Sequence, residues 1–346
     1  MKVNTEEAIR DVTRAIKAGL VVMLHGSPGI GKSSIIRTIA NKHNLKLIDV
    51  RLSQCDPCDL LGFPSIQDGQ AKYIPMDIFP LEGAELPYRL MDNKQKQYDG
   101  YLIFFDEFNS AALSVQAASY KIILDKKVGQ HNIHPRAAMV CAGNMAGNNA
   151  IVNRLSTAMQ SRLIHLELVT SLSHWINWAN ANKLDHRIIS YVQSCPDNLH
   201  KFDPNHNDKT FACERTWEFA SKLIKDSTEP LQNYLALLAG TISEAVAREF
   251  VAYTSMYVDL PTIPEILANP NTAKLTEDPS MMYAVSHMIA ANATCKNITV
   301  FMDYIVRLPV EFETITLQNV ISRNKDMIKE ACICDWIAVK GMELFT

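Results

Sequence analysis

The chain has 346 residues, which at about 150 residues per domain predicts two or three domains. Hydrophobic residues make up 47% of it, so the chain can bury a large core, and wholesale disorder is excluded. With 37 acidic and 34 basic residues, the net charge is −3, which disfavours a dedicated duplex-DNA binder. No stretch is apolar over the roughly 18 residues that a membrane-spanning helix needs.

The amino terminus and the cysteines indicate a cytoplasmic protein. The first residues, MKVNTEEAIRD, are charged at once and lack the pattern of a secretory signal. Eight cysteines are scattered through the chain, and we expect reduced thiols. Cys55 and Cys58 form a C-x-x-C pair, and Cys332 and Cys334 form a C-x-C pair. A structural zinc site needs four converging ligands, whereas these pairs fall in regions predicted as different domains, so we expect no zinc.

The first half of the chain alternates short apolar runs with amphipathic stretches. Asn4 and Glu7 suit a capping box at the start of the first helix, and Gly19 suits its end. The predicted helices span 4–18, 33–43, 114–124 and 155–161. The predicted strands span 20–24, 45–52, 101–105, 137–141 and 163–168. Strands that alternate with helices predict an α/β fold with a parallel five-stranded sheet flanked by helices.

After residue 169, helical periodicity replaces the strand signals. The predicted helices span 172–180, 185–192, 214–225, 231–257, 281–291, 299–307 and 316–338. Four prolines between residues 261 and 279 mark a looser connection. We therefore expect an α/β domain over 1–170, a helical domain over 171–260 and a helical C-terminal extension over 261–346.

Residues 26–33, GSPGIGKS, match the phosphate-loop pattern G-x-x-x-x-G-K-[ST]. The motif follows a predicted strand and opens a predicted helix, which an ordinary glycine-rich turn need not do. Its backbone N–H groups and the helix N-terminus can hold phosphate, Lys32 can reach the β and γ oxygens, and Ser33 can ligate Mg²⁺. The pattern thus implies ATP and Mg²⁺. The candidate nucleotide-binding residues are Gly26, Ser27, Pro28, Gly29, Ile30, Gly31, Lys32, Ser33 and Ser34.

Two carboxylates, Asp106 and Glu107, follow the apolar strand 101–105. At the carboxyl end of a buried parallel strand, Asp106 could complete a Mg²⁺ site together with Ser33. Glu107 could orient and deprotonate an attacking water. A strand that simply ends in solvated acids is the alternative, but the phosphate loop upstream favours the catalytic interpretation. A water-activating base also favours a hydrolase over a nucleotide kinase.

One asparagine and three arginines complete the candidate set. Asn144 follows the strand 137–141 and would lie beside Glu107, within reach of the γ-phosphate or the water, although asparagine there is also a common turn residue. Arg162 precedes the fifth strand, Arg154 lies eight residues earlier, and Arg215 starts a helix. Lone arginines are usually solvated or salt-bridged, so a role for these three depends on a family resemblance.

The order of the motifs GSPGIGKS, FFDEFN, CAGN, SRLIHLEL and CERTW resembles that of the AAA+ ATPases, and within them the MoxR-type branch of the dynein-related group. The resemblance covers about residues 1–260, and the remainder resembles an extension seen in some MoxR-like proteins. It implies a helical lid over 171–260 and the following roles: Lys32 and Ser33 as Walker A, Asp106 and Glu107 as Walker B, Asn144 as sensor 1, Arg162 as the arginine finger for a neighbouring subunit, and Arg215 as sensor 2. Glu214 departs from the proline that similar proteins often have before sensor 2.

Two loops fit the same branch. Residues 60–80 contain Asp68 and Gly69, a hairpin signal, and resemble the insertion in helix 2 that faces the ring pore. Residues 128–135 resemble the hairpin that precedes sensor 1. Plain surface loops are the alternative for both.

The resemblance implies a ring-forming, hexameric, ATP-hydrolysing enzyme that remodels or activates a protein partner. MoxR-like proteins often act with a partner that carries a von Willebrand factor A domain. The alternative is a nucleic-acid-directed motor of the helicase or packaging type, which needs a basic pore surface; the candidates are Lys94, Lys96, Lys126, Lys127 and His131. A monomeric nucleotide kinase would leave Glu107 and Arg162 unexplained. We expect a cytoplasmic homo-oligomer, without a membrane segment and without bound nucleic acid.

Overall fold

The computed structural model describes residues 1–67, 69–91, 94–145, 153–205 and 208–340. The chain divides into two compact units, the first formed by Met1–Thr170 with Asp203–Asn205, and the second by Ser171–Phe202 with His206–Thr346. The boundary that the sequence predicts near 260 lies inside the second unit. No helix in the described ranges is long and apolar enough to cross a membrane.

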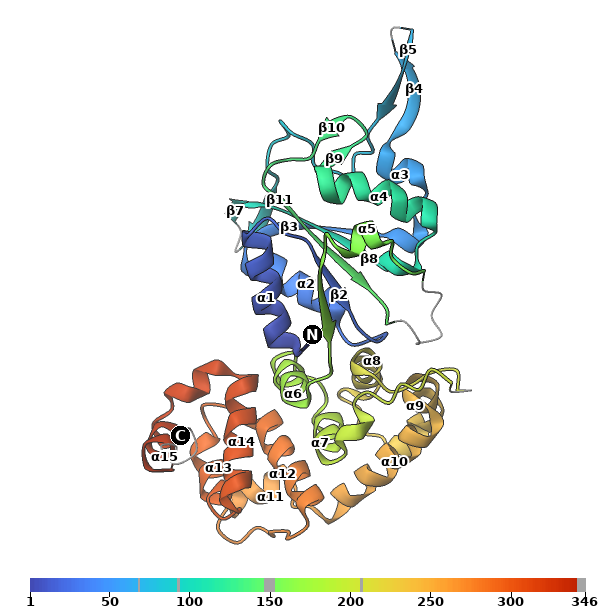
Figure 1. Cartoon of the computed structure of the whole chain (residues 1–346). Helices are drawn as coiled ribbons and strands as arrows, with labels where there is room; N and C mark the ends of the chain where they lie inside the picture. The colour runs from blue at the N-terminus through green and yellow to red at the C-terminus, as the bar shows by residue number, and fades with distance from the viewer. Residues whose placement is uncertain (68, 92–93, 146–152, 206–207, 341–346) are drawn as a thin grey trace. The chain divides into compact units, whose positions relative to one another are not determined.

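The first unit is built on a parallel sheet of six strands, in the order β1-β12-β2-β11-β8-β3 (Figure 1). Five of these strands confirm the predicted α/β fold, and β1 adds a two-residue edge strand that is too short to give a periodic signal. The strands are β1 (Lys2–Val3), β2 (Val22–His25), β3 (Leu45–Arg51), β8 (Gly100–Asp106), β11 (Ala137–Gly143) and β12 (Ile164–Leu168).

Helices cover both faces of this sheet. On one face lie α1 (Thr5–Lys17) and α2 (Lys32–Lys42), and on the other lie α3 (Pro57–Leu61), α4 (Leu113–Asp125) and α5 (Thr157–Gln160). Successive side chains of a strand point to opposite faces, so Leu24 packs with the first group and Met23 with the second. Because both faces are buried, the central strands are apolar throughout, which is why the sequence predicted them well.

Three hairpins extend from the first unit: β4 (Phe63–Gln67) with β5 (Gln70–Ile74), β6 (Tyr88–Met91) with β7 (Lys94–Gln97), and β9 (Lys127–Val128) with β10 (His131–Asn132). The first and third confirm the hairpins predicted within 60–80 and 128–135. The second was missed, because each of its strands is only four residues long and β7, KQKQ, is entirely polar.

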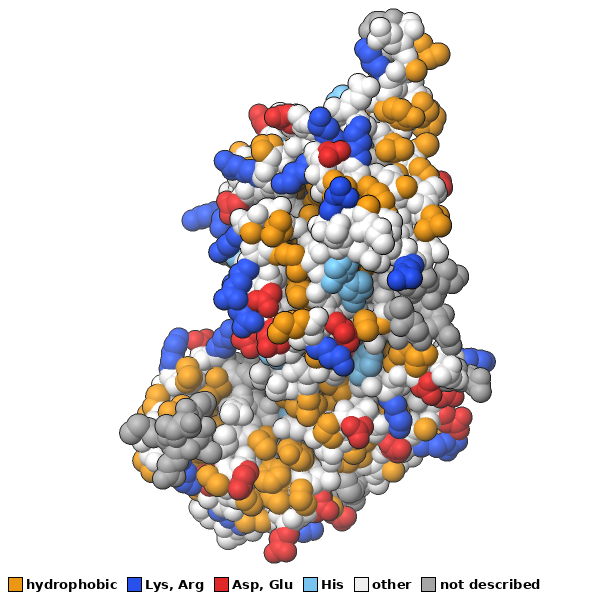
Figure 2. Space-filling view, viewed as in Figure 1, with side chains coloured by type: hydrophobic (Ala, Val, Ile, Leu, Met, Phe, Trp, Pro, Cys, Tyr) orange, Lys and Arg blue, Asp and Glu red, His pale blue; other side chains and the backbone are white. Residues whose placement is uncertain are grey.

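One face of the β4–β5 hairpin is apolar. Its register pairs Pro64 with Tyr73 and Ile66 with Ala71, and all four side chains share that face. Ile66 is 80% exposed and Tyr73 is 45% exposed. Figure 2 shows hydrophobic side chains along this hairpin. The hairpin therefore presents apolar surface that the described part of the chain leaves largely uncovered.

The second unit is helical. It contains α6 (Leu172–Ala181), α7 (His186–Ser194), α8 (Glu214–Ile224), α9 (Leu235–Ile242), α10 (Glu244–Ser255), α11 (Ile263–Ala268), α12 (Pro279–Asn292), α13 (Ile298–Ile305), α14 (Val310–Arg323) and α15 (Ala331–Lys340). Two of the long predicted helices were wrong. The first, 231–257, is broken at Ser243, which has a left-handed φ of 76°. The second, 316–338, is split by a 3₁₀ turn over Lys325–Lys329.

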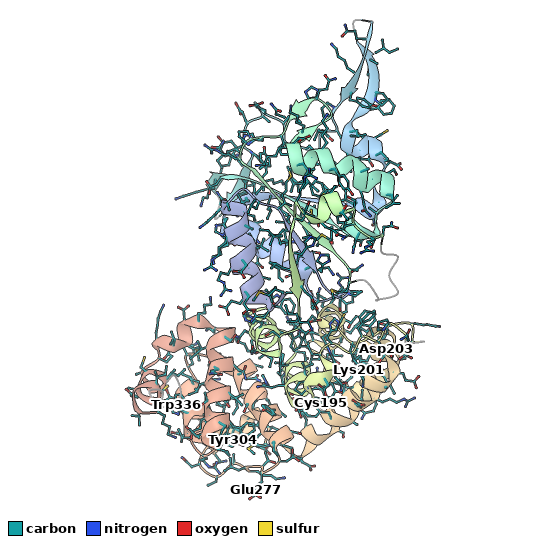
Figure 3. The ribbon with its side chains drawn as sticks, in the orientation of Figure 1. Cys195, Lys201, Asp203, Glu277, Tyr304 and Trp336 are labelled. Carbon is teal, nitrogen blue, oxygen red and sulfur yellow. The ribbon has the colours of Figure 1, made fainter. Side chains whose placement is uncertain are left out.

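The helical unit holds two hydrophobic clusters. One surrounds Tyr191 and Trp217, whose ring centroids lie 5.6 Å apart. The other surrounds Tyr304 and Trp336, both labelled in Figure 3. Buried polar contacts link the helices of the two clusters: Asn180 on α6 donates to Asn319 on α14 at 2.7 Å. Polar bonds of this kind, once buried, are costly to break, so they fasten the C-terminal helices to those before residue 260.

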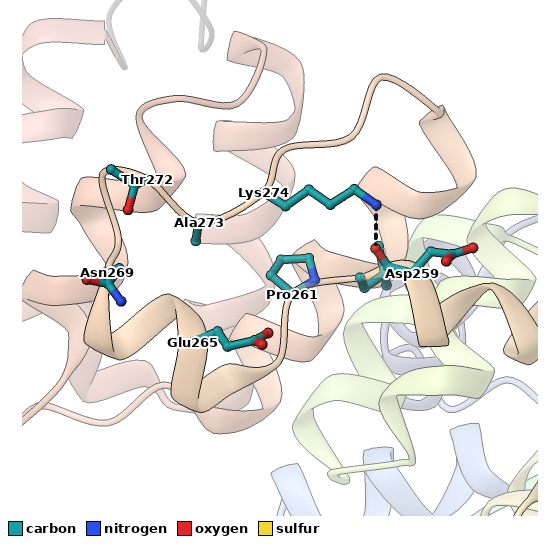
Figure 4. A pocket seen from close by; sticks show the side chains of 8 residues that line it. Asp259, Pro261, Glu265, Asn269, Thr272, Ala273 and Lys274 are labelled. Carbon is teal, nitrogen blue, oxygen red and sulfur yellow. Dashed lines mark hydrogen bonds between the residues drawn. The ribbon is translucent and has the colours of Figure 1, made fainter.

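A pocket of about 350 Å³ lies at the connection between the two clusters (Figure 4). Its lining includes Asp259, Glu265 and Lys274, and the ammonium of Lys274 donates to the carbonyl oxygen of Asp259 at 3.1 Å. Glu265 accepts from the backbone N–H of Thr262 at 2.8 Å, as part of the cap of α11. The side chains of Lys274 and Glu265 thus help to hold the proline-rich connection in place.

A buried histidine makes the stability of the helical unit depend on pH. His287 on α12 is fully buried, and its Nε2 hydrogen-bonds to Gln193. Burial first, and then the positive charge of Arg323 and the neighbouring His186, lower the pKa of His287 from 6.5 to about 3. The folded protein therefore keeps this imidazole neutral at pH values where the unfolded chain binds a proton.

We predict that the free energy of unfolding falls as the pH drops below 6.5, by up to about 1.4 kcal/mol per pH unit from His287 alone, until the pH approaches 3. Urea unfolding at several pH values, followed by tryptophan fluorescence, measures this, because all four tryptophans lie in the helical unit. His287→Gln should reduce the pH dependence and leave the part due to His186, whose pKa burial lowers to about 4, whereas His131→Gln, at an exposed position, should leave it unchanged. An equal slope in wild type and His287→Gln would contradict the prediction.

Candidate nucleotide-binding site

The phosphate loop lies between the end of β2 at His25 and the start of α2 at Lys32. Gly29 and Gly31 have φ values of 80° and 93°, in the left-handed region that favours glycine. The backbone N–H of Gly26 donates to Gly143 at 3.2 Å, which ties the loop to the end of β11. The loop thereby presents the N-terminus of α2 at the carboxyl edge of the sheet.

The Lys32 side chain folds back over this loop. Its ammonium donates to the carbonyl oxygens of Gly26 at 2.8 Å and Ser27 at 3.1 Å. It also donates to Oδ1 of Asn144 at 3.3 Å. The structure therefore brings together the lysine and the asparagine that the sequence placed on different elements, and both lie where a phosphate in the loop would be.

Ser33 and Asp106 meet at the same edge. The Ser33 hydroxyl donates to Oδ2 of Asp106 at 2.9 Å, and Oδ1 of Asp106 accepts from the backbone N–H of Glu107 at 2.8 Å. Nearby on β3, partial burial, and then the Asp106 carboxylate, raise the pKa of Asp49. The site thus concentrates negative charge beside two oxygen donors, which suits a hard divalent cation such as Mg²⁺.

Glu107 leaves β8 in a left-handed conformation, with φ 54°. Its Oε2 accepts a hydrogen bond from the hydroxyl of Ser53, which lies in the turn after β3. Ser53, which follows the neighbouring strand β3, thus holds the Glu107 carboxylate. Sequence reasoning missed Ser53, although it follows an apolar strand just as Asp106 and Asn144 do.

Asn109 is a second residue that sequence reasoning missed. It lies in the turn Phe108–Ser110 and is only 4% exposed. Its Nδ2 donates to the carbonyl oxygen of Asn144 at 2.8 Å, and its Oδ1 accepts from the backbone N–H of Asn144 at 3.0 Å. The side chain of Asn109 therefore holds the main chain of Asn144 on both sides.

Two histidines pair directly before the phosphate loop. Nε2 of His25 and Nδ1 of His165 lie 3.0 Å apart, and Nε2 of His165 donates to the carbonyl oxygen of Gln160 at 3.0 Å. The second bond leaves Nδ1 of a neutral His165 as the acceptor. Burial, followed by the proximity of His165, lowers the pKa of His25. The pair therefore ties the end of β2, directly before the loop, to β12.

Arg162 does not join this group. Ile164 of β12 pairs with Val22 at the start of β2, so Arg162 lies beyond the amino ends of the strands, whereas Gly26 follows their carboxyl ends. The four residues of β2 separate the two edges by ~13 Å. Arg162 is exposed and donates to the carbonyl oxygen of Ala158 at 3.0 Å.

Arg154 and Arg215 are the other two arginines that the sequence singled out. Arg154 is exposed and follows residues 146–152, which lie outside the described ranges. Arg215 is the second residue of α8 in the helical unit and is exposed. All eight cysteines are free thiols, and the described residues contain no group of three or more His, Cys, Asp or Glu side chains placed to hold a metal ion.

Residues 22–165 match the model of the ATPase family associated with various cellular activities (AAA). The matched segment runs from β2 to β12 and includes the phosphate loop, the Asp106–Glu107 pair and Asn144. The chain therefore carries an AAA-type domain, which supports an AAA+ ATPase and ATP hydrolysis in general.

Two solved structures are similar over most of the chain. One is a candidate ATPase of Cytophaga hutchinsonii, at 16% identity and a TM-score of 0.35, covering 94% of this chain and 85% of that one. The other is a proline-to-glycine variant of RuvB from Thermotoga maritima, at 15% identity and a TM-score of 0.34, with the same coverages of 94% and 85%. These values are too low for either protein to inform the function of this chain.

Lys32→Ala should abolish ATP binding, because the loop loses the cation that lies over it. Binding of a fluorescent ATP analogue measures the change. Lys42→Ala, at the exposed far end of the same helix, is the matched control and should bind normally. Equal affinity in the Lys32 variant and wild type would contradict the phosphate-loop assignment.

Proposed function

We propose that the chain is an ATP-hydrolysing, ring-forming AAA+ ATPase of the MoxR type that remodels or activates a protein partner. The observation that carries the proposal is the meeting of Lys32, the Ser33–Asp106 pair, Glu107 and Asn144 at one edge of the sheet. These are the groups that phosphate binding, cation binding and water activation require.

Nucleotide binding is assigned to residues 26–34. The backbone N–H groups of the loop and the N-terminus of α2 would hold the phosphates, and Lys32 would turn from its carbonyl partners toward the β and γ oxygens. Ser33 and Asp106 fit Mg²⁺, since their oxygens lie 2.9 Å apart and both are hard donors. When bound, the cation would neutralise charge on the β- and γ-phosphates.

Hydrolysis is assigned to Glu107 and Asn144. A carboxylate beside the terminal phosphate can accept the proton of the attacking water, provided that the carboxylate is ionised and free to face that water. The bond from Ser53 fixes Glu107 at the sheet edge, and Asn144 offers an amide to the γ-phosphate or the water. Arg215 would act as sensor 2, an assignment that rests on the family resemblance.

We predict that Glu107→Gln binds ATP and Mg²⁺ as wild type does, but turns ATP over at least about a hundredfold more slowly, because it loses the general base. Asp106→Asn should instead raise the Mg²⁺ concentration needed for half-maximal activity, because one cation ligand loses its charge. Steady-state turnover across a Mg²⁺ series separates the two effects. Loss of nucleotide binding to the same extent in both variants would show that the two carboxylates do not have separate roles.

Ring formation is proposed from the position of Arg162. At the amino edge of the sheet, this exposed arginine lies away from the phosphate loop of its own unit. An arginine so placed can serve a nucleotide only if that nucleotide is bound to another subunit. An arginine finger supplied by a neighbour is worth about 10³–10⁵ in rate, so an assembled ring, expected to be a hexamer, would be the active form.

We predict that Arg162→Ala binds ATP but hydrolyses it poorly, and that wild-type specific activity rises with protein concentration. Mixing Arg162→Ala with Lys32→Ala subunits should restore part of the activity, since an intact loop can then face an intact Arg162 on its neighbour. Arg14→Ala, which changes an exposed arginine on α1, is the control and should behave as wild type. No rescue on mixing, with activity independent of concentration, would indicate that the chain acts alone.

The protein partner is proposed from the family resemblance, which favours one with a von Willebrand factor A domain. The Glu107→Gln variant should hold the ATP-bound state and retain such a partner, whereas Lys32→Ala should not. Salt-dependent retention on single-stranded DNA would instead favour the alternative, a nucleic-acid-directed motor.

A further inference from the structure

The contacts of Asn109 are unusual for a turn residue, because both ends of its side-chain amide bond to one other residue. Nδ2 and Oδ1 hold the carbonyl oxygen and the N–H of Asn144 at 2.8 and 3.0 Å. A buried amide is costly unless it is hydrogen-bonded, and an apolar side chain would fill the same space without that cost. We therefore attribute the role of the Asn109 amide to its hydrogen bonds with the main chain of Asn144.

The neighbouring glycine shows how closely the two segments approach. A Cβ added to Gly143 would lie 2.2 Å from Oδ1 of Asn109 and 2.7 Å from its Cγ. Gly143 does not have a positive φ, so a left-handed backbone does not account for the glycine. Close approach does, since the Asn109 amide fits against the end of β11 only where residue 143 has no side chain.

The two bonded segments are functionally distinct parts of the site. Asn109 follows Glu107 by two residues, in the turn that leaves β8. Asn144 follows β11 and accepts from the Lys32 ammonium at 3.3 Å. The carbonyl oxygen of Asn109 also accepts from the N–H of Asn153, on the segment that leads toward α5. Asn109 thus joins the segment that follows β8 to the segment that follows β11.

We infer that Asn109 is a positioning residue for ATP hydrolysis: by fixing the main chain of Asn144, it aims the Asn144 side chain at the terminal phosphate held by Lys32. This inference rests on the proposed function. Asn109 acts through Asn144, the residue that both ends of its amide hold. Its loss should therefore lower turnover more than it lowers nucleotide affinity.

The first test compares Asn109→Asp and Asn109→Ala with wild type in ATP affinity and kcat. Asp keeps the shape and the acceptor but places an oxygen against the carbonyl oxygen of Asn144, where Asn donated. Both variants should bind ATP within about threefold of wild type and turn it over at least about tenfold more slowly, since a misplacement of 1 Å can cost about 10²-fold.

The second test asks whether Asn109 acts through Asn144. If it does, Asn109→Ala combined with Asn144→Ala should have the kcat of Asn144→Ala alone, whereas independent roles would multiply the two losses. Gly143→Ala should lower kcat in wild type and add little in the Asn109→Ala background, where the space that Oδ1 occupied is free. The remaining close contact of that methyl is the flexible end of Met23.

Asn44→Ala is the matched control for lost stability. Asn44 is 6% exposed, its Nδ2 also donates to a main-chain carbonyl at 2.9 Å, and it lies at the opposite edge of the sheet. The Asn44→Ala substitution should lower the melting temperature without changing kcat. An equal loss of kcat in this control, or multiplied losses in the double variant, would overturn the inference and leave a structural role. If Asn109→Asp turns ATP over at the wild-type rate, the inference alone is overturned. If the wild-type protein does not turn ATP over, both the inference and the proposed function are overturned.

Discussion

The hydrogen bond between Ser33 and Asp106 joins the phosphate loop to a strand two places away in the sheet, across 73 residues of sequence. It can form only because β2, β11 and β8 are parallel and in a register that ends them at one edge. The bonds from Lys32 to Asn144 and from Ser53 to Glu107 depend on the same alignment. A shift of one residue in β8 would turn Asp106 to the other face and leave the loop without its carboxylate.

The predictions from the sequence succeeded where the signal was local. The buried strands are continuous apolar runs, and the phosphate loop is a contiguous motif, so both were placed correctly. Ser53, Asn109 and the His25–His165 pair were missed because each owes its place to strand order, which the sequence does not state. The helix break at Ser243 was missed because the apolar spacing continues across it, although Gly240 lies three residues earlier.

The helical unit shows how a boundary in sequence can differ from a boundary in packing. Prolines loosen the chain after residue 260, and a separate hydrophobic cluster begins there. Yet Arg323 on α14 donates to Asn180 at 2.9 Å and to the carbonyl oxygen of Leu184 at 2.8 Å, both on the earlier side. Burial lowers the pKa of Arg323, which shows that the protein keeps a cation in this junction at a cost in solvation. Motion of the earlier helices would be transmitted to the later ones through these bonds.

The β4–β5 hairpin carries a hazard for the isolated chain. Two strands with an apolar face and no further strand paired on either side, within the described residues, are a template for intermolecular β-pairing and aggregation. Two residues oppose this. Pro64 withholds an N–H from β4, and Lys72 places a charge on β5. A missing donor and a charge thus act against self-association of the hairpin, so neutralisation of Lys72 would weaken that protection.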